Sequence, residues 1–171
     1  GDIDGDDKPD LAVANYGGNS VSVFRSTATL GNISFAARVN FTTGTNPISV
    51  SIGDIDVDGK PDLAVTNYGS NTVSVFRSTS TSGTISFTTK VDFTTGTQPR
   101  IVCIGDLDGD GKPDLAVPNV GSNTISILQS TSTSGTIGFA AKFDAATGTG
   151  PRGGSIGDID GDGKPDLVVP Y

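Results

Sequence analysis

Short runs in which apolar and polar residues alternate recur along the whole chain. The runs Ile48–Ile52 and Thr72–Phe76 place Ile or Val at every second position, which is typical of β-strands with one buried face. Gly, Asn and Pro residues separate these runs, and no segment shows the apolar spacing of a helix. The pattern therefore predicts an all-β protein built from short strands.

The strand pattern repeats with a constant period of 52 residues. Gly-Asp pairs begin at positions 1, 53, 105 and 157 without insertions, and such periodicity indicates a repeat protein. Each period contains about four strand-like runs, which fits a four-stranded antiparallel blade of a β-propeller. We expect repeat 1 at residues 1–52, lacking its first strand, repeat 2 at 53–104, repeat 3 at 105–156 and a partial fourth repeat at 157–171.

Two kinds of connection recur between the predicted strands. The segments Gly17–Asn19, Gly69–Asn71 and Gly121–Asn123 are predicted hairpin turns, because Gly and Asn tolerate a positive φ. The Ser/Thr tract at residues 78–82 is predicted to be a solvated loop, with a glycosylated or ligand-binding edge as the alternative.

Charge and composition exclude several classes of partner. All 19 acidic residues are Asp, and the net charge is −8 with a pI near 4.2. This charge argues against nucleic acid and against an anionic membrane surface, whereas cations are favoured. No run of about 18 apolar residues is present, so no membrane insertion is expected. Cys103, the single cysteine, lies in a strand-like run and is interpreted as a strand residue.

The Asp residues are concentrated in four copies of a loop that opens each repeat. Each copy has Asp at its first, third, fifth and ninth positions and Lys at its seventh, and these loops hold 17 of the 19 Asp residues. Ca²⁺ takes six to eight oxygen ligands, which a curled loop of this kind supplies from side chains and from the Lys carbonyl. The candidate metal ligands are Asp2, Asp4, Asp6, Lys8 and Asp10; Asp54, Asp56, Asp58, Lys60 and Asp62; Asp106, Asp108, Asp110, Lys112 and Asp114; and Asp158, Asp160, Asp162, Lys164 and Asp166.

The alternative is that these Asp residues only form turns. Turns do not require such a concentration, and clustered carboxylates repel one another unless a cation neutralises them. Four Ca²⁺ ions would also balance the formal charge of −8. The Lys side chains should point to solvent, since an ammonium is repelled by the ion. The second loop should bind most weakly, because Val57 replaces the Gly of the other copies.

The loop of residues 105–114, Gly-Asp-Leu-Asp-Gly-Asp-Gly-Lys-Pro-Asp, and the following Leu-Ala-Val resemble the FG-GAP and VCBS repeats. These repeats occur in integrin α-chain propellers and in secreted bacterial surface proteins, and the resemblance covers the whole chain. It implies a calcium-binding β-propeller in an extracellular setting, where millimolar Ca²⁺ suits sites with a Kd of about 10⁻⁴–10⁻³ M.

Three classes of function are considered. Catalysis is not expected, because the chain has no His or Glu and only Asp92 and Asp144 lie outside the loops. A structural or adhesive role in a propeller, ring or surface filament is favoured. Carbohydrate or protein recognition, with Tyr16 and Tyr68 as aromatic platforms, is the alternative, as is a non-catalytic accessory module of a secreted enzyme.

The predicted partners follow from the two ends of the sequence. The chain starts within a motif at Gly1 and ends two strands into a fourth repeat, so we expect it to be part of a longer protein. Both ends should expose unpaired strand edges, which pair with further repeats of the parent chain or with copies of the same chain. Glycans or surface proteins are additional candidate partners.

Overall fold

The computed structural model describes residues 1–171 and contains thirteen β-strands and one three-residue 3₁₀ turn, η1 (Tyr16–Gly18). The prediction of an all-β protein is confirmed. The first seven strands are β1 (Leu11–Asn15), β2 (Ser20–Phe24), β3 (Val39–Thr42), β4 (Pro47–Gly53), β5 (Asp62–Asn67), β6 (Thr72–Phe76) and β7 (Val91–Thr94). The remaining six are β8 (Cys103–Gly105), β9 (Asp114–Asn119), β10 (Thr124–Leu128), β11 (Phe143–Ala146), β12 (Ser155–Gly157) and β13 (Asp166–Val168).

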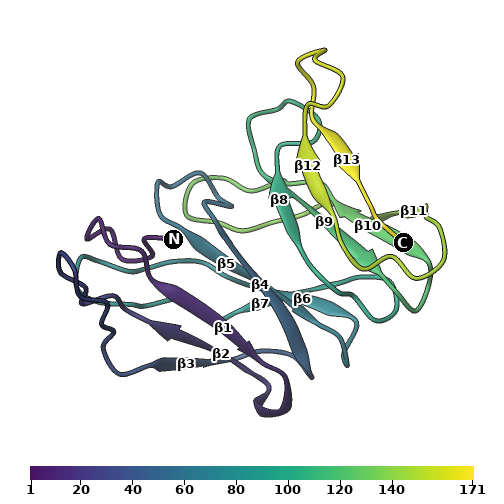
Figure 1. Ribbon diagram of the computed structural model, residues 1–171. Helices are drawn as coiled ribbons and strands as arrows, with labels where there is room; N and C mark the ends of the chain where they lie inside the picture. Colours follow the sequence, from purple (N-terminus) through teal and green to yellow (C-terminus); the bar gives the residue numbers. More distant parts are fainter.

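The strands form four antiparallel sheets that follow one another along the chain (Figure 1). Two complete sheets have the orders β4-β5-β6-β7 and β8-β9-β10-β11, the first sheet has β1-β2-β3, and the last has β12-β13. The leading strands β4, β8 and β12 contact one another in succession. This arrangement is that of propeller-like blades placed side by side, without a closed ring.

Each complete sheet begins with the strand before its Asp loop. The loop of residues 54–61 joins β4 to β5, and the loop of residues 106–113 joins β8 to β9. In the register of these pairs Gly53 lies opposite Asp62, and Gly105 lies opposite Asp114. The Asp loops are therefore hairpin connections between the first two strands of a blade.

Two apolar cores lie between neighbouring sheets, which explains why the second strand of a blade is the most buried. All six residues of β5 are buried. Its residues Leu63 and Val65 pack toward the first sheet, whereas Ala64 packs toward the third. The core between sheets one and two contains Ile3, Val21, Val23, Leu63, Val65 and Phe76. The core between sheets two and three contains Ile55, Ala64, Val73, Val75, Val102, Leu115, Val117 and Leu128.

The predicted turns and the predicted strand position of Cys103 are confirmed. Asn19, Asn71 and Asn123 adopt φ values of 48°, 56° and 54°, so Asn rather than Gly takes the left-handed conformation in these turns. The Asn71 Oδ1 also accepts a hydrogen bond from the Gln98 amide at 2.8 Å. Cys103 lies in β8, where burial raises the pKa of its thiol.

The prediction that the Ser/Thr tract is a solvated loop is correct only in part, because Thr79, Thr81 and Ser82 are exposed but the tract belongs to a hairpin with two buried residues. Each tract forms a short hairpin, here called the Ser–Phe hairpin, that covers residues 26–35, 78–87 or 130–139. Ser78 and Ser80 are buried. The Ser80 hydroxyl donates to the Ser86 carbonyl and accepts from the Ser86 amide, so the side chain replaces backbone pairing across the hairpin and can be buried without loss of hydrogen bonds.

The chain contains no helix that is long and apolar enough to cross a membrane.

Candidate metal centre

The first Asp of each loop curls the backbone around its own carboxylate. In the first loop, Asp2 Oδ1 accepts hydrogen bonds from the amides of Gly5 and Asp6 at 2.8 and 3.1 Å. Its Oδ2 accepts one from Asp7 at 2.8 Å. The third and fourth loops repeat this pattern through Asp106 and Asp158. This network is the local reason that the spacing of the Asp residues folds into a compact loop.

The ninth Asp fastens the loop to the rest of the blade. Asp62 Oδ2 accepts a hydrogen bond from Ile55 at 2.9 Å, and its Oδ1 accepts one from Ser78 at 2.7 Å. Asp10 and Asp114 make the equivalent pairs of bonds, while Asp166 bonds to Ile159. A carboxylate carries about four lone-pair sites, so these bonds leave the ninth Asp able to coordinate a metal.

The structure brings three carboxylates together in every loop. Within each group the oxygens lie within 4.8 Å of one another. The first two groups contain the first, third and fifth Asp, and the last two contain the first, third and ninth. The groups are Asp2, Asp4 and Asp6; Asp54, Asp56 and Asp58; Asp106, Asp108 and Asp114; and Asp158, Asp160 and Asp166.

Burial makes these clusters costly without a counter-charge. Burial, together with the neighbouring carboxylates of Asp56 and Asp58, raises the pKa of Asp62 to about 6. The hydrogen bonds from Ser78 and Ile55 lower this pKa but do not offset the effect of burial. Burial is also the main cause that raises the pKa of Asp4, Asp56 and Asp114. A cation in the loop would remove this penalty by favouring the ionised form.

Asp56 shows the most direct fit to a cation. The residue is fully buried, and neither carboxylate oxygen has a hydrogen-bond partner of normal geometry. The amides of Gly135 and Asp58 lie near enough to lower its pKa, but burial and the charge of Asp58 outweigh them. A buried carboxylate without partners is strongly unfavourable, and hard oxygen donors of this kind are the ligands that Ca²⁺ takes.

The prediction that the Lys side chains point to solvent agrees with Lys164, whose side chain is 83% exposed, but is wrong for Lys8 and Lys60, which contact oxygen atoms of the protein. The Lys8 Nζ lies 3.4 Å from Asp6 Oδ2, and the Lys60 Nζ donates to the Ser80 carbonyl at 3.2 Å. One carboxylate oxygen of the fifth Asp accepts a hydrogen bond from the Lys backbone amide. The second oxygen is therefore free to pair with an ammonium group. Lys112 and Lys164 approach Asp110 and Asp162 in the same way, each at 3.8 Å. Coordination through the Lys carbonyls stays a prediction.

Sequence reasoning missed one repeated position, which lies directly after the third strand of a complete blade. The side chain at this position contacts an Asp of the loop. The Arg25 guanidinium lies 3.8 Å from Asp6 Oδ2, and the Arg77 guanidinium lies 3.5 Å from Asp58 Oδ2. At the equivalent place Gln129 donates to Asp108 Oδ2 at 2.5 Å. These donors share the 52-residue period of the loops, which is the signal that could have identified them.

The two Asp residues outside the loops belong to a different arrangement. Asp92 accepts a hydrogen bond from the buried Ser74 hydroxyl at 2.6 Å, and Lys90 pairs with its second oxygen. Asp144 has the same environment with Ser126 and Lys142. Neither carboxylate meets a second acidic group, so the structure brings no pair together for acid–base chemistry.

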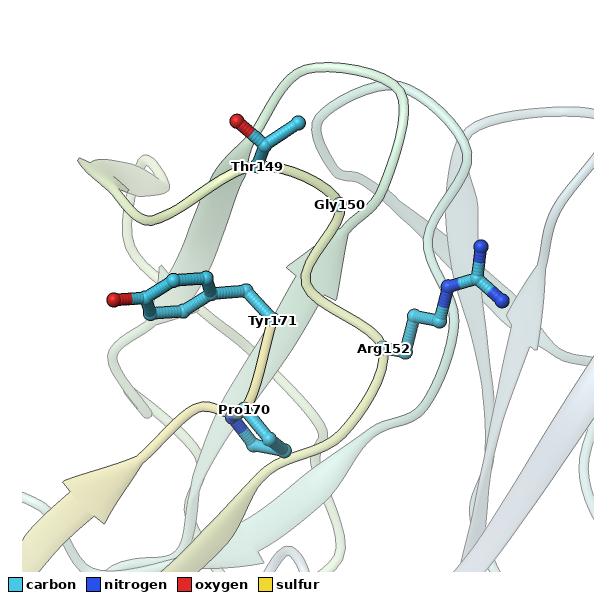
Figure 2. A pocket seen from close by; sticks show the side chains of 5 residues that line it. All are labelled: Thr149, Gly150, Arg152, Pro170 and Tyr171. Atoms are coloured by element: carbon cyan, nitrogen blue, oxygen red, sulfur yellow. The ribbon is translucent and has the colours of Figure 1, made fainter.

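The other cavities carry no comparable cluster. Figure 2 shows an open pocket lined by Thr149, Gly150, Arg152, Pro170 and Tyr171, in which the Arg152 and Tyr171 side chains point apart. It has no acidic lining residue. Tyr16 is 53% exposed at the end of β1 and lines no pocket.

Comparison with known proteins agrees with the repeat and the loops. A comparison with curated proteins found no match. The sequence profile of the FG-GAP-like repeat matches residues 2–65, 54–117 and 119–169. These regions include the Asp loops and the strands that follow them. The chain therefore belongs to the FG-GAP-like repeat family and forms a repeat-containing, β-propeller-like module.

Proposed function

We propose that this module binds Ca²⁺ through its four Asp loops and that the ions stabilise the blades. The observation that carries the proposal is Asp56, whose buried carboxylate has no hydrogen-bond partner and lies among the oxygens of Asp54 and Asp58. A divalent cation is the simplest group that satisfies three such carboxylates together. The other three loops offer oxygen clusters of the same size.

The donor set favours Ca²⁺ over other metals. The loops offer only oxygen atoms, the chain has no His, and Cys103 lies in β8 outside the loops, whereas Zn²⁺ and copper prefer nitrogen or sulfur. Mg²⁺ requires a near-ideal octahedron and retains several waters. Ca²⁺ accepts a more variable geometry of oxygen ligands, so loops rich in carboxylates fit it better.

The proposed role is structural or adhesive, in an extracellular or cell-surface setting. FG-GAP repeat domains are generally non-catalytic, and no acid–base pair or activated nucleophile lies near the loops, which supports a role without catalysis. Sites whose ligands all come from one short loop suit a Kd of about 10⁻⁴–10⁻³ M, a range matched to extracellular Ca²⁺.

The proposed partners are further repeats of the same kind, from a parent chain or from a second copy. Ile33 and Phe35 of the first Ser–Phe hairpin are 85% and 43% exposed, whereas their counterparts Ile85 and Phe87 pack against the core of the preceding blade. An equivalent blade would cover the first hairpin in the same way. Light scattering in Ca²⁺ should find dimers, rings or fibres, and a folded, monodisperse monomer would refute this pairing.

Calcium titration tests the proposed function. Calorimetry should find up to four Ca²⁺ ions per chain, and Asp110→Ala should remove one. A saturating ion contributes about 2.7 kcal/mol per site at a hundredfold excess over Kd, so chelation should lower the melting temperature. Absence of binding at about 5 mM Ca²⁺, several times the weak end of extracellular sites, would refute the proposal.

A second candidate function is recognition of a glycan or a surface protein, alone or as an accessory module of a secreted enzyme. The exposed ring of Tyr16 favours it, because aromatic faces stack on apolar sugar faces and anchor protein interfaces. A glycan array probed with the wild-type chain and with Tyr16→Ala tests this candidate.

A further inference from the structure

The third Asp of the loop is buried in the first two loops and exposed in the last two. Asp4 is 4% exposed and Asp56 is 0% exposed, whereas Asp108 and Asp160 are exposed. The loops share one sequence pattern, so their own residues do not account for the contrast. What differs is the structure that lies over them.

A Ser–Phe hairpin from the following blade covers each of the two buried positions. The Gly83 amide, at the tip of the second hairpin, donates to Asp4 Oδ2 at 2.9 Å across a sequence separation of 79 residues. The third hairpin has the equivalent place over Asp56, because its Ile137 and Phe139 pack against the core that contains the neighbouring Ile55, and Gly135 is the counterpart of Gly83 at its tip. Gly83 and Gly135 have φ values of 84° and 86°, a conformation that favours Gly.

The contact between loop and hairpin belongs to a wider junction of three segments. Residues 3–5 of the first loop, 59–61 of the second loop and 80–82 of the hairpin line one cavity. The Lys60 ammonium donates to the Ser80 carbonyl in this junction, so the hairpin is held by the loop of its own blade while its tip contacts the loop of the preceding blade.

We infer that an Asp loop covered by the Ser–Phe hairpin of the next blade forms a shared calcium site, in which the hairpin encloses the third carboxylate and, at Asp4, also orients it. Gly83 is a positioning residue in this arrangement, and Gly135 has the equivalent place at the tip of the third hairpin. The inference rests on the proposed calcium function and adds that ion binding and blade docking are coupled.

The coupling has a physical basis in charge and burial. An amide donor fixes the orientation of the carboxylate before the ion arrives, and exclusion of water strengthens the attraction between ion and carboxylate. Linkage is reciprocal, so an ion that binds better to the covered loop also favours the covered state. In these 171 residues the first two loops are covered and should show this coupling, whereas the last two should not.

A titration followed by ¹⁵N-glycine NMR tests the inference with Ca²⁺ alone as the probe. Gly5, Gly59, Gly111 and Gly163 report the four loops, and Gly83, Gly135 and Gly31 report the three hairpin tips. In the wild-type chain Ca²⁺ should slow amide exchange at Gly83 and Gly135 but not at Gly31. Asp4→Asn should abolish the slowing at Gly83 alone, and the control Asp108→Asn should leave both tips slowed.

Hairpin variants test the reverse direction. Gly83→Val strains the tip at a positive φ and should weaken binding at the Gly5 reporter about tenfold, without change at Gly111. Gly31→Val introduces the same strain at φ 78° in a hairpin that covers no loop of its own chain, and should leave the Gly5 reporter unchanged. The inference would be overturned if four ions bind but Ca²⁺ does not slow amide exchange at Gly83 and Gly83→Val does not weaken binding. The proposed function would then still stand. Absence of binding would overturn both.

Discussion

At the scale of single residues, the second loop differs from the others because of Val57. This residue adopts φ 57°, a conformation in which a β-branched side chain is strained. The Asp54 Oδ1 accepts only the Asp58 amide, whereas in the other loops the first Asp also accepts the amide of the Gly at the fourth position. The substitution therefore removes one bond of the network that curls the loop.

Replacement of Val57 by Gly should stabilise the second loop. Relief of the strain is worth about 1–3 kcal/mol, and the flexibility of Gly in the unfolded chain offsets about 0.5–1 kcal/mol of it. Val57→Gly should raise the melting temperature by about 3 °C and tighten calcium binding at this loop, as measured by calorimetry. The reciprocal change Gly5→Val should weaken the first loop, and equal melting temperatures for Val57→Gly and wild type would contradict the account.

The raised pKa of Asp62 predicts an unusual dependence of stability on pH in calcium-free buffer. Asp62 titrates at about 6 in the folded chain and at 3.8 in the unfolded reference, so the folded state binds the proton more tightly. Its contribution to stability is fully present below 3.8 and is lost as the pH rises through about 6. Urea unfolding should show the metal-free chain to be more stable at pH 5 than at pH 7.

Calcium should reverse this trend, because protons compete with the ion for the carboxylates. The control variant Asp62→Asn should be less stable overall, since one of the amides of Ile55 and Ser78 loses its acceptor, but its stability should vary less between pH 5 and pH 7. A metal-free chain that loses stability steadily on acidification would contradict the assignment.

The sequence predicted the acidic residues of the site but not their partners. Spacing alone identified the Asp residues because the loop is local, and the side-chain hydrogen bonds within it span two to seven positions. The approach of Arg77 and the Lys60–Ser80 bond depends on how a hairpin folds back over the loop. Such contacts join segments that are distant in the sequence, so the local pattern of strands and turns does not predict them, and only the 52-residue period marks the position of Arg77.

At the scale of elements, a hydrogen-bonded ladder runs across each blade. In the second blade Asn67 Nδ2 donates to the Ser74 hydroxyl at 2.8 Å, and Ser74 donates to Asp92 at 2.6 Å. The first blade repeats the ladder with Asn15, Ser22 and Asn40. The ladder links three adjacent strands through a buried polar position and helps to fix their register.

Removal of the central hydroxyl should destabilise the blade. Ser74→Ala leaves Asn67 and Asp92 without a shared partner, which costs about 1–3 kcal/mol for a buried group. Ser22→Ala is the matched control and should cost less, because its acceptor Asn40 is neutral and charged acceptors form stronger hydrogen bonds. Denaturant unfolding in saturating Ca²⁺ measures both losses, and equal losses would show that the charge of Asp92 contributes nothing.

The strands were predictable from the sequence, whereas the Ser–Phe hairpins were not. The alternation in Thr72–Phe76 matches β6, and the Asn-containing turns lie where their φ values require them. The tract around Ser80 has a polar composition typical of loops. It is buried because a side-chain hydroxyl takes over backbone pairing, a substitution that composition does not reveal.

At the scale of the whole molecule, negative charge is concentrated in four clusters, within each of which the carboxylate oxygens lie within 4.8 Å of one another. The net charge of −8 equals in magnitude the charge of four divalent ions. Self-repulsion should destabilise the metal-free chain, and salt screens such repulsion with a Debye length of about 10 Å at 0.1 M.

Salt should therefore stabilise the metal-free chain and have little effect on the calcium-loaded chain. Calorimetric melting in about 0.02 M and about 0.5 M NaCl, a range over which screening changes strongly, measures the difference. The expected result is a clear rise of the melting temperature with salt in chelator and a much smaller change in Ca²⁺. Equal salt responses in the two states would show that the ions do not neutralise the loops.

The hydrogen bond between Asp4 and Gly83 has a consequence for the order in which the molecule is built. A ribosome that has added Asp4 must add a further 79 residues before the amide that covers this carboxylate exists. Multi-unit proteins fold progressively from the N-terminus during synthesis, so each loop waits, open to water, until the next blade has emerged. Maturation of the sites follows the direction of translation, one blade behind the growing end of the chain.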